Sequence, residues 1–121
     1  MKFKLYTVNY QHRGGLPLHQ KAQWRVDEWE ELRLFAMAQK NNWICEKSCL
    51  WSVNEEFKVI GEDERGDLYY AKYWSNQDNW HGFPVSSKRD ADRPPSKTLK
   101  DWVDRGYVRK KIASRIAEGK F

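Results

Sequence analysis

Cysteine is scarce in this chain, with only Cys45 and Cys49 among 121 residues. One pair is too few to hold a disulfide-stapled scaffold together. The spacing C-x-x-x-C also lacks a second ligand pair at the separation typical of zinc sites. We therefore predict two buried or half-buried free thiols and no metal site.

Long apolar runs are absent as well. No stretch approaches the roughly 20 apolar residues that a membrane span requires. The first residues, Met1 to Tyr6, alternate charged and apolar side chains, unlike the continuous apolar segment of a secretion signal. We therefore expect no membrane partner and a cytoplasmic location.

The familiar catalytic and cofactor motifs are missing too. No serine lies in a G-x-S-x-G elbow. Arg13-Gly14-Gly15 is a simple turn, and the chain has neither a phosphate-binding loop nor a dinucleotide fingerprint. The acidic residues between positions 55 and 67 fit a solvated hairpin tip better than a two-metal site. We expect no cofactor.

Aromatic and charged residues, by contrast, are plentiful. Aromatics make up 15% of the chain, including seven Trp, and charged residues make up 32%. This composition is typical of a folded protein, and the length fits one domain over residues 1–121. Because each aromatic ring buries a large apolar area, we expect most of them in the core.

The clearest predicted element is a helix over residues 27–41. Asp27 can accept a hydrogen bond as N-cap, and Glu30 stands three residues later, as in a capping box. Helical spacing then predicts one apolar stripe, formed by Trp29, Leu32, Phe35 and Ala36.

Shorter patterns predict strands around this helix. Alternation favours a strand over residues 3–10, and residues 18–24 fit a second short strand. Residues 43–53 fit two short strands or one bent strand. Residues 57–60 and 68–74 predict a hairpin around the polar loop 61–67. The fold class is therefore α+β: a small antiparallel sheet of three to five strands, with one helix packed on a face.

The last third of the chain predicts a different organisation. After the sheet and helix of residues 1–74, residues 75–95 form a long polar stretch without periodicity, which we interpret as a loop. Residues 96–118 predict a C-terminal two-helix arm, a basic helical hairpin with Gly106 between its helices. Ser96 or Thr98 can cap the first helix. The apolar positions are Leu99, Trp102 and Val103 in the first helix, and Val108, Ile112 and Ile116 in the second.

The positive charge is concentrated in this last part. Residues 1–87 hold 11 Lys and Arg against 12 Asp and Glu, whereas residues 88–121 hold 11 against 5. Such segregation favours a binding surface for nucleic acid or for an acidic protein. Aromatic rings beside cations suit single strands, because bases stack on rings while phosphates pair with cations. The binding residues we predict are Lys88, Arg89, Arg93, Arg109, Lys110, Lys111, Arg115, Trp80 and Phe83.

The leading hypothesis is thus a small non-enzymatic binding module whose basic arm engages nucleic acid or an acidic protein. The first alternative is a metal-independent ribonuclease, which needs a base, an acid and a cation near one phosphate. Its candidate residues are His12, Arg13, His19, Lys21 and His81. The second alternative is a protein–protein inhibitor or immunity-type protein that uses exposed aromatics as hot spots.

Overall fold

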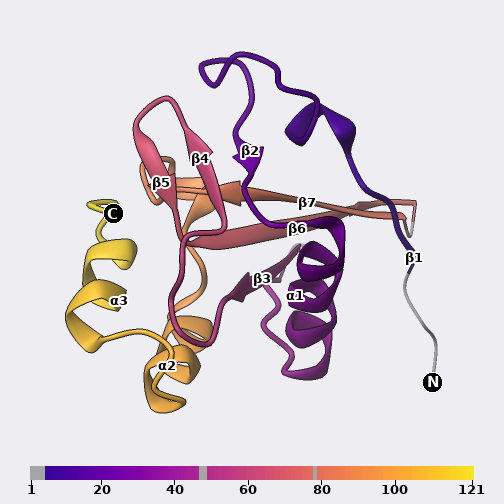
Figure 1. Cartoon of the computed structure of the whole chain (residues 1–121). Helices are drawn as coiled ribbons and strands as arrows, with labels where there is room; N and C mark the ends of the chain where they lie inside the picture. The colour runs from indigo at the N-terminus through magenta and orange to yellow at the C-terminus, as the bar shows by residue number, and fades with distance from the viewer. Residues whose placement is uncertain (1–4, 47–48, 78) are drawn as a thin grey trace.

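A computed structural model describes residues 5–46, 49–77 and 79–121 of the chain (Figure 1). Residues 3 and 4 of the first predicted strand lie outside this part, as do residues 47 and 48 of the predicted 43–53 strands. The described residues form two small β-sheets, three α-helices and two short 3-10 turns.

The larger sheet has four strands in the order β1-β7-β6-β3. Its centre is the antiparallel pair β6 (Tyr70–Asn76) and β7 (Asn79–Val85). β3 (Cys49–Val53) extends β6 on one side, and the two-residue β1 (Leu5–Tyr6) pairs with β7 in parallel. The buried core lies between this sheet and the helices.

The smaller sheet has the order β2-β4-β5 and consists of β2 (Gln23–Trp24), β4 (Gly61–Asp63) and β5 (Gly66–Leu68). It packs on β7: a Cβ at Gly61 would lie 2.4 Å from Pro84 Cγ, so only glycine fits there. Trp24 adds a hydrogen bond of 3.3 Å from its indole N–H to the carbonyl of Gly82. The predicted loop 61–67 therefore consists largely of β4, a tight turn and β5.

These elements confirm the predicted α+β class, with a helix on one face and a two-helix arm at the C-terminus. The helix is α1 (Glu28–Lys40), and the side chain of Asp27 accepts a hydrogen bond of 2.9 Å from the N–H of Glu30, as the capping pattern predicted. The arm consists of α2 (Ser96–Asp104) and α3 (Lys110–Ala117). Figure 1 shows α1 beside β3 and the arm at the other end of the sheet.

The predicted apolar stripe of α1 is wrong in part. Trp29 is 80% exposed and Leu32 is also exposed, whereas the fully buried side includes the carboxyl-bearing Glu31. The buried residues of α1 are Glu31, Leu34, Phe35 and Ala38. The stripe is rotated because the carboxyl of Glu31 finds polar partners inside the fold, which allows a charged residue on the buried face.

The predicted long loop 75–95 is also wrong, because β7 occupies residues 79–85. Trp80, Gly82 and Pro84 are buried, alternating with the half-buried His81 and Phe83. After β7 the chain makes a 3-10 turn over Asp90–Asp92. This turn is anchored to the sheet by β6 side chains: Tyr70 donates to the carbonyl of Asp92 at 2.7 Å, and Lys72 pairs with its carboxylate.

The arm packs against the rest of the molecule through its apolar residues. Trp102 and Ile116 are fully buried and Val108 is nearly so, while Ile112 is half-buried. Neither of the predicted caps acts, because α2 follows Pro95 and no side chain caps its first N–H groups. Gly106 adopts the left-handed φ of 78° between the two helices, as its predicted role requires.

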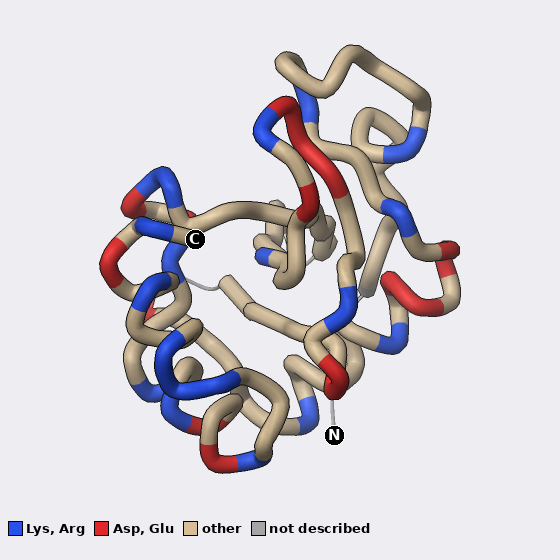
Figure 2. The backbone as a smooth tube through the Cα atoms, turned by 60° about the vertical axis from the view of Figure 1, so that its left-hand side comes forward, with Lys and Arg blue, Asp and Glu red and all other residues tan. Residues whose placement is uncertain are grey.

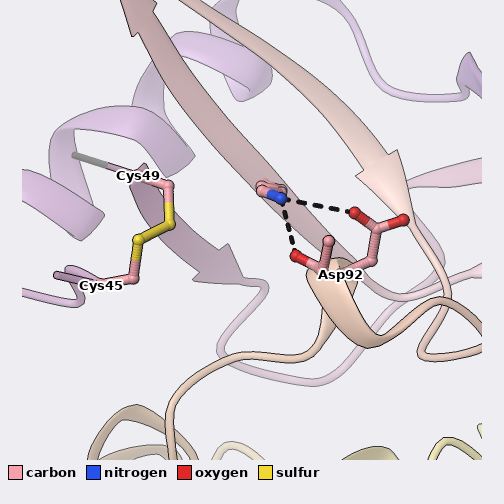
Figure 3. Close-up of a disulfide and its surroundings, with 5 residues drawn as sticks. Cys45, Cys49 and Asp92 are labelled. Atoms are coloured by element: carbon pink, nitrogen blue, oxygen red, sulfur yellow. Dashed lines mark hydrogen bonds and ion pairs between the residues drawn. A yellow bond between two sulfur atoms is a disulfide. The ribbon is translucent and has the colours of Figure 1, made fainter. Parts of the chain in front are cut away.

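The two cysteines form a disulfide, which corrects the predicted free thiols (Figure 3). The N–H of Cys45 donates to the carbonyl of Cys49 at 2.9 Å, and Ile44 pairs with Leu50 in an antiparallel bridge. The two Cα atoms lie 5.3 Å apart, within the range that a disulfide spans. Among the described helices, none has the length and apolar character needed to cross a membrane.

Candidate nucleic-acid interface

The first of two large hollows is a cleft of about 550 Å³, which we call the histidine cleft. It lies between the 9–22 loop, the β4–β5 turn and the end of β7. Three predicted catalytic residues line it, His12, His19 and Lys21, together with three predicted binding residues, Phe83, Lys88 and Arg89. The fold therefore brings together two sets of residues that lie far apart along the chain.

His12 is held rigidly at the wall of this cleft. Its Nδ1 lies 2.7 Å from the carbonyl oxygen of Ala22, and its ring stacks on Phe83 at 5.2 Å. Burial lowers the pKa of His12 below its ordinary value; the positive charge of Lys21 adds to this and the bond to Ala22 opposes it. A neutral His12 therefore donates from Nδ1 to Ala22 and leaves Nε2 as an acceptor.

Two other predicted catalytic residues lie elsewhere. Arg13 donates from Nε to the buried carboxyl of Glu31 at 2.8 Å, and the hydroxyl of Tyr6 donates to the other carboxyl oxygen. Arg13 is thus part of an internal polar cluster. His81 lies across from Trp74 in the β6–β7 register, with the rings 5.4 Å apart. Neither residue lines the histidine cleft.

The second hollow is a groove of about 810 Å³ between the arm and the segment around β5, which we call the arm groove. Phe57 and Tyr69 stack in it at 4.9 Å with their planes 11° apart. The ring of Phe121 lies 5.7 Å from Phe57 and 5.5 Å from Tyr69. All three rings are half-buried, as is Tyr107 on the same wall, so each keeps part of its surface open.

Cations at the start of α3 border the arm groove. Arg109 and Lys110 line it, and Lys111 follows on the exposed side of the helix. Within the described part of the chain, no ion pair engages these three side chains. Figure 2 shows Lys and Arg gathered along this arm. Arg115 is close by, with its guanidinium 6.0 Å from the ring of Phe121.

Two of the predicted binding residues have internal roles instead. Arg93 donates to the carbonyl of Ser87 at 2.9 Å and pairs with Asp90, so its guanidinium braces the segment after β7. Trp80 is only 4% exposed and packs 5.8 Å from Phe35 in the core. Its ring face is covered and cannot stack on a base.

The arm groove supplies aromatics that sequence reasoning missed: Phe57, Tyr69, Tyr107 and Phe121. Only Tyr107 and Phe121 lie near the basic residues along the chain. Phe57 and Tyr69 come from separate segments that meet through the tertiary fold. No group of three or more His, Cys, Asp or Glu in the described residues is placed to hold a metal ion. Comparison with known proteins gave no matching family model, no matching curated protein and no matching solved structure.

Proposed function

We propose that this protein binds single-stranded nucleic acid in the arm groove. The observation that carries the proposal is the stacked pair Phe57 and Tyr69, both half-buried beside Arg109 and Lys110, which form no ion pair in the described structure. Bases stack on aromatic faces and phosphates pair with cations, and the groove offers both within one hollow. In a duplex the bases already stack on each other, so a single strand fits this wall better.

The arm groove is lined by acidic residues as well as by cations. Glu55 and Glu56 lie on its wall away from the arm. Glu55 accepts two hydrogen bonds of 2.9 Å from Arg33, and Glu56 lies 3.4 Å from Lys58, so both carboxylates have positive partners outside the groove. The phosphates would run along the α3 side, away from these acids, with the bases turned toward the rings. An acidic protein would use the same cations but would have no need of the partly exposed rings.

Salt-dependent binding tests the proposal. A labelled 12-nucleotide oligouridylate should bind at about 50 mM salt and release between there and about 200 mM. Replacing Arg109, Lys110, Lys111 and Arg115 together by Ala should flatten the dependence of log affinity on log salt, by about 0.7 for every phosphate that the variant no longer neutralises. The control is Lys40→Ala with Lys97→Ala, which removes two exposed cations outside the groove.

The aromatic contribution needs its own variant. Tyr69→Leu should lower affinity by about 1–3 kcal/mol, the usual worth of one base–aromatic stack, and leave the salt slope unchanged. Circular dichroism and a urea titration check that the fold persists. No binding to RNA or DNA at about 50 mM salt refutes the proposal. Binding to an acidic polypeptide alone, unaffected by Tyr69→Leu, would assign the arm to a protein partner.

A metal-independent ribonuclease is the second candidate, favoured by the cleft that His12, His19 and Lys21 line together. In this reaction Nε2 of His12 takes the proton of a 2′-hydroxyl while the 2′-oxygen bonds to phosphorus. The P–O5′ bond breaks, and the 5′-oxygen receives a proton from protonated His19. The products are a 2′,3′-cyclic phosphate and a 5′-hydroxyl. Cleavage should disappear with His12→Ala and with DNA, which lacks the 2′-hydroxyl.

The third candidate is a protein–protein inhibitor, and the exposed apolar residues of α1 support it. Trp29 and Leu32 expose apolar surface on α1, one helical turn apart. Exposed aromatics of this kind act as hot spots in protein interfaces. Nothing in the described structure indicates which protein would cover them, so this function stays a prediction.

A further inference from the structure

A smaller hollow lies between the arm groove and the histidine cleft. This connecting pocket has a volume of about 200 Å³. Tyr69 and Phe121 line both it and the arm groove. Val85 and Ser86 line both it and the histidine cleft. Each end of the connecting pocket therefore shares side chains with a larger hollow.

Cations accompany the whole path. Each hollow has at least two Lys or Arg on its walls: Arg109 and Lys110 in the arm groove, Arg115 and Lys120 in the connecting pocket, and Lys21, Arg65, Lys88 and Arg89 in the histidine cleft. Within the described residues, no ion pair engages any of the four in the histidine cleft. Aromatic surface is also present at both ends, because Phe83 and the 39%-exposed Trp74 line the histidine cleft.

The acids along the path do not interrupt it. Asp92 lies in the histidine cleft but pairs with Lys72 at 3.5 Å, which is outside it. Asp63, Glu64 and Asp67 all belong to the β4–β5 hairpin. These acids therefore border the path on the side of the hairpin. The cations Lys88 and Arg89 and those of the arm border it on the other side.

We propose that the arm groove, the connecting pocket and the histidine cleft form one track, occupied by a single strand of nucleic acid. The histidine cleft is then a second subsite for the strand that the arm groove binds, and this inference rests on the proposed function. A strand leaving the arm groove passes over Phe121, which lines the arm groove and the connecting pocket. It then passes over Ser86, which lines the connecting pocket and the histidine cleft. Small domains that bind single strands cover about 4 to 16 nucleotides, so a 12-nucleotide strand is a suitable probe.

Photocrosslinking of the full chain tests the track directly. Two 12-nucleotide oligouridylates carry one 4-thiouridine each, at the 5′ end or at the 3′ end, and mass spectrometry locates the crosslinked peptides. We expect one end in the arm groove, at Phe57, Tyr69, Tyr107 or Phe121. The other end should reach the histidine cleft, at residues 18–22 or Phe83. Crosslinks from both ends to the arm groove alone would overturn the track and leave the proposed function standing.

A charge variant gives an independent measurement. Lys88→Ala with Arg89→Ala should lower the salt slope of the 12-nucleotide probe by about 1.4, because each of the two cations neutralises one phosphate and contributes about 0.7 to the slope. The matched control, Lys40→Ala with Lys97→Ala, should leave the slope unchanged. An unchanged slope in the Lys88 and Arg89 variant, together with the expected flatter slope in the four-residue arm variant, overturns the track alone. No binding at low salt, or crosslinks confined to the histidine cleft, overturns both the proposed function and the track.

Discussion

Ser87 and Phe121 hold the end of the arm against the end of β7. The backbone N–H and the hydroxyl of Ser87 both donate to the backbone oxygen of Phe121 at 2.9 Å. The N–H of Phe121 donates to Ser87 Oγ, also at 2.9 Å. These contacts place the Phe121 ring between the arm groove and the connecting pocket. The position of the arm therefore determines the shape of both hollows.

Ser87→Ala should loosen the end of the arm without unfolding the sheet. It removes the hydroxyl from a fully buried position and leaves the N–H of Phe121 without its acceptor, which costs about 1–3 kcal/mol. Hydrogen exchange should then show faster exchange for the α3 amides and unchanged protection for those of β6. Equal loss of protection in both elements would show that arm and sheet open as one unit.

Trp102→Ala should cost much more. Trp102 is fully buried, and its ring lies 5.8 Å from Trp43 and 6.2 Å from Tyr70. Truncating such a side chain lowers the free energy of unfolding by about 3–5 kcal/mol. Urea titration measures the change, with Lys97→Ala, an exposed position on α2, expected to stay within about 0.5 kcal/mol of the wild type. A small effect of Trp102→Ala would show that the arm contributes little to the core.

Local patterns predicted the elements whose contacts are local. The Asp27 cap and the left-handed Gly106 depend on residues a few positions away, and both predictions are confirmed. The buried face of α1 is different, because the partners of Glu31 are Tyr6 and Arg13, 25 and 18 residues away. Nothing in a helical pattern shows that a carboxyl has such partners.

The sequence pattern did not predict β7 because this strand contains Gly82 and Pro84, two residue types that strands normally avoid. A Cβ at Gly82 would lie 2.3 Å from the ring of Tyr73, so the close packing of β6 side chains requires glycine there. Pro84 is tolerated because, among the described residues, β1 pairs with Asn79 and Trp80 and no strand forms a ladder with β7 on that side at position 84. Both reasons are tertiary and do not appear in the sequence pattern.

In the candidate site, too, the sequence predicted what depends on neighbouring residues and missed what depends on tertiary contacts. His12, His19 and Lys21 come from one loop, so their common cleft has a local origin. The arm groove instead gathers rings from four separate places in the chain, and the segregation of charge indicated only its basic side. The rings of Phe57 and Tyr69 lie beside α3 only because of the tertiary fold, so the sequence pattern did not predict them.

Reducing the Cys45–Cys49 disulfide should weaken the fold modestly. The bond closes a loop between residues only four positions apart, which restricts the unfolded chain less than a long loop would. The loop-entropy relation gives about 2 kcal/mol for so short a loop. Urea titration with and without dithiothreitol measures the effect on the wild type. A Cys45→Ser, Cys49→Ser variant is the control and should not respond to the reductant.

His12 should stay neutral at neutral pH. Burial lowers its pKa below the ordinary value of 6.5, so its imidazole should titrate below that pH in a heteronuclear NMR experiment. The nitrogen shifts should also show the proton on Nδ1, which faces Ala22, and a bare Nε2. Because the folded state disfavours protonated His12, this residue lowers stability as the pH falls below 6.5. A proton found on Nε2 would remove His12 as the base of the ribonuclease candidate.

Glu31 should have the opposite effect on stability. Burial raises the pKa of Glu31 above its ordinary value, outweighing the lowering by its hydrogen bonds from Tyr6 and Arg13. The folded state therefore holds this proton at a pH where the unfolded chain has lost it. The resulting stabilisation is fully present below the unfolded pKa of about 4.3 and is lost as the pH rises through the folded pKa. The loss is about 1.4 kcal/mol for each unit that separates the two values.

Glu31→Gln isolates this effect, because glutamine has no proton to lose. The variant also leaves the guanidinium of Arg13 without its carboxylate, but Arg13 stays charged at every pH used, so that cost is a constant offset. Urea titrations from pH 4 to pH 8 should show that the wild type loses stability relative to Glu31→Gln as the pH rises. Glu64→Gln, at an exposed position in the β4–β5 turn, is the control and should follow the wild-type profile. If Glu31→Gln kept the wild-type slope, the pH dependence would belong to another group, and the buried Glu31 would titrate as an ordinary carboxylate.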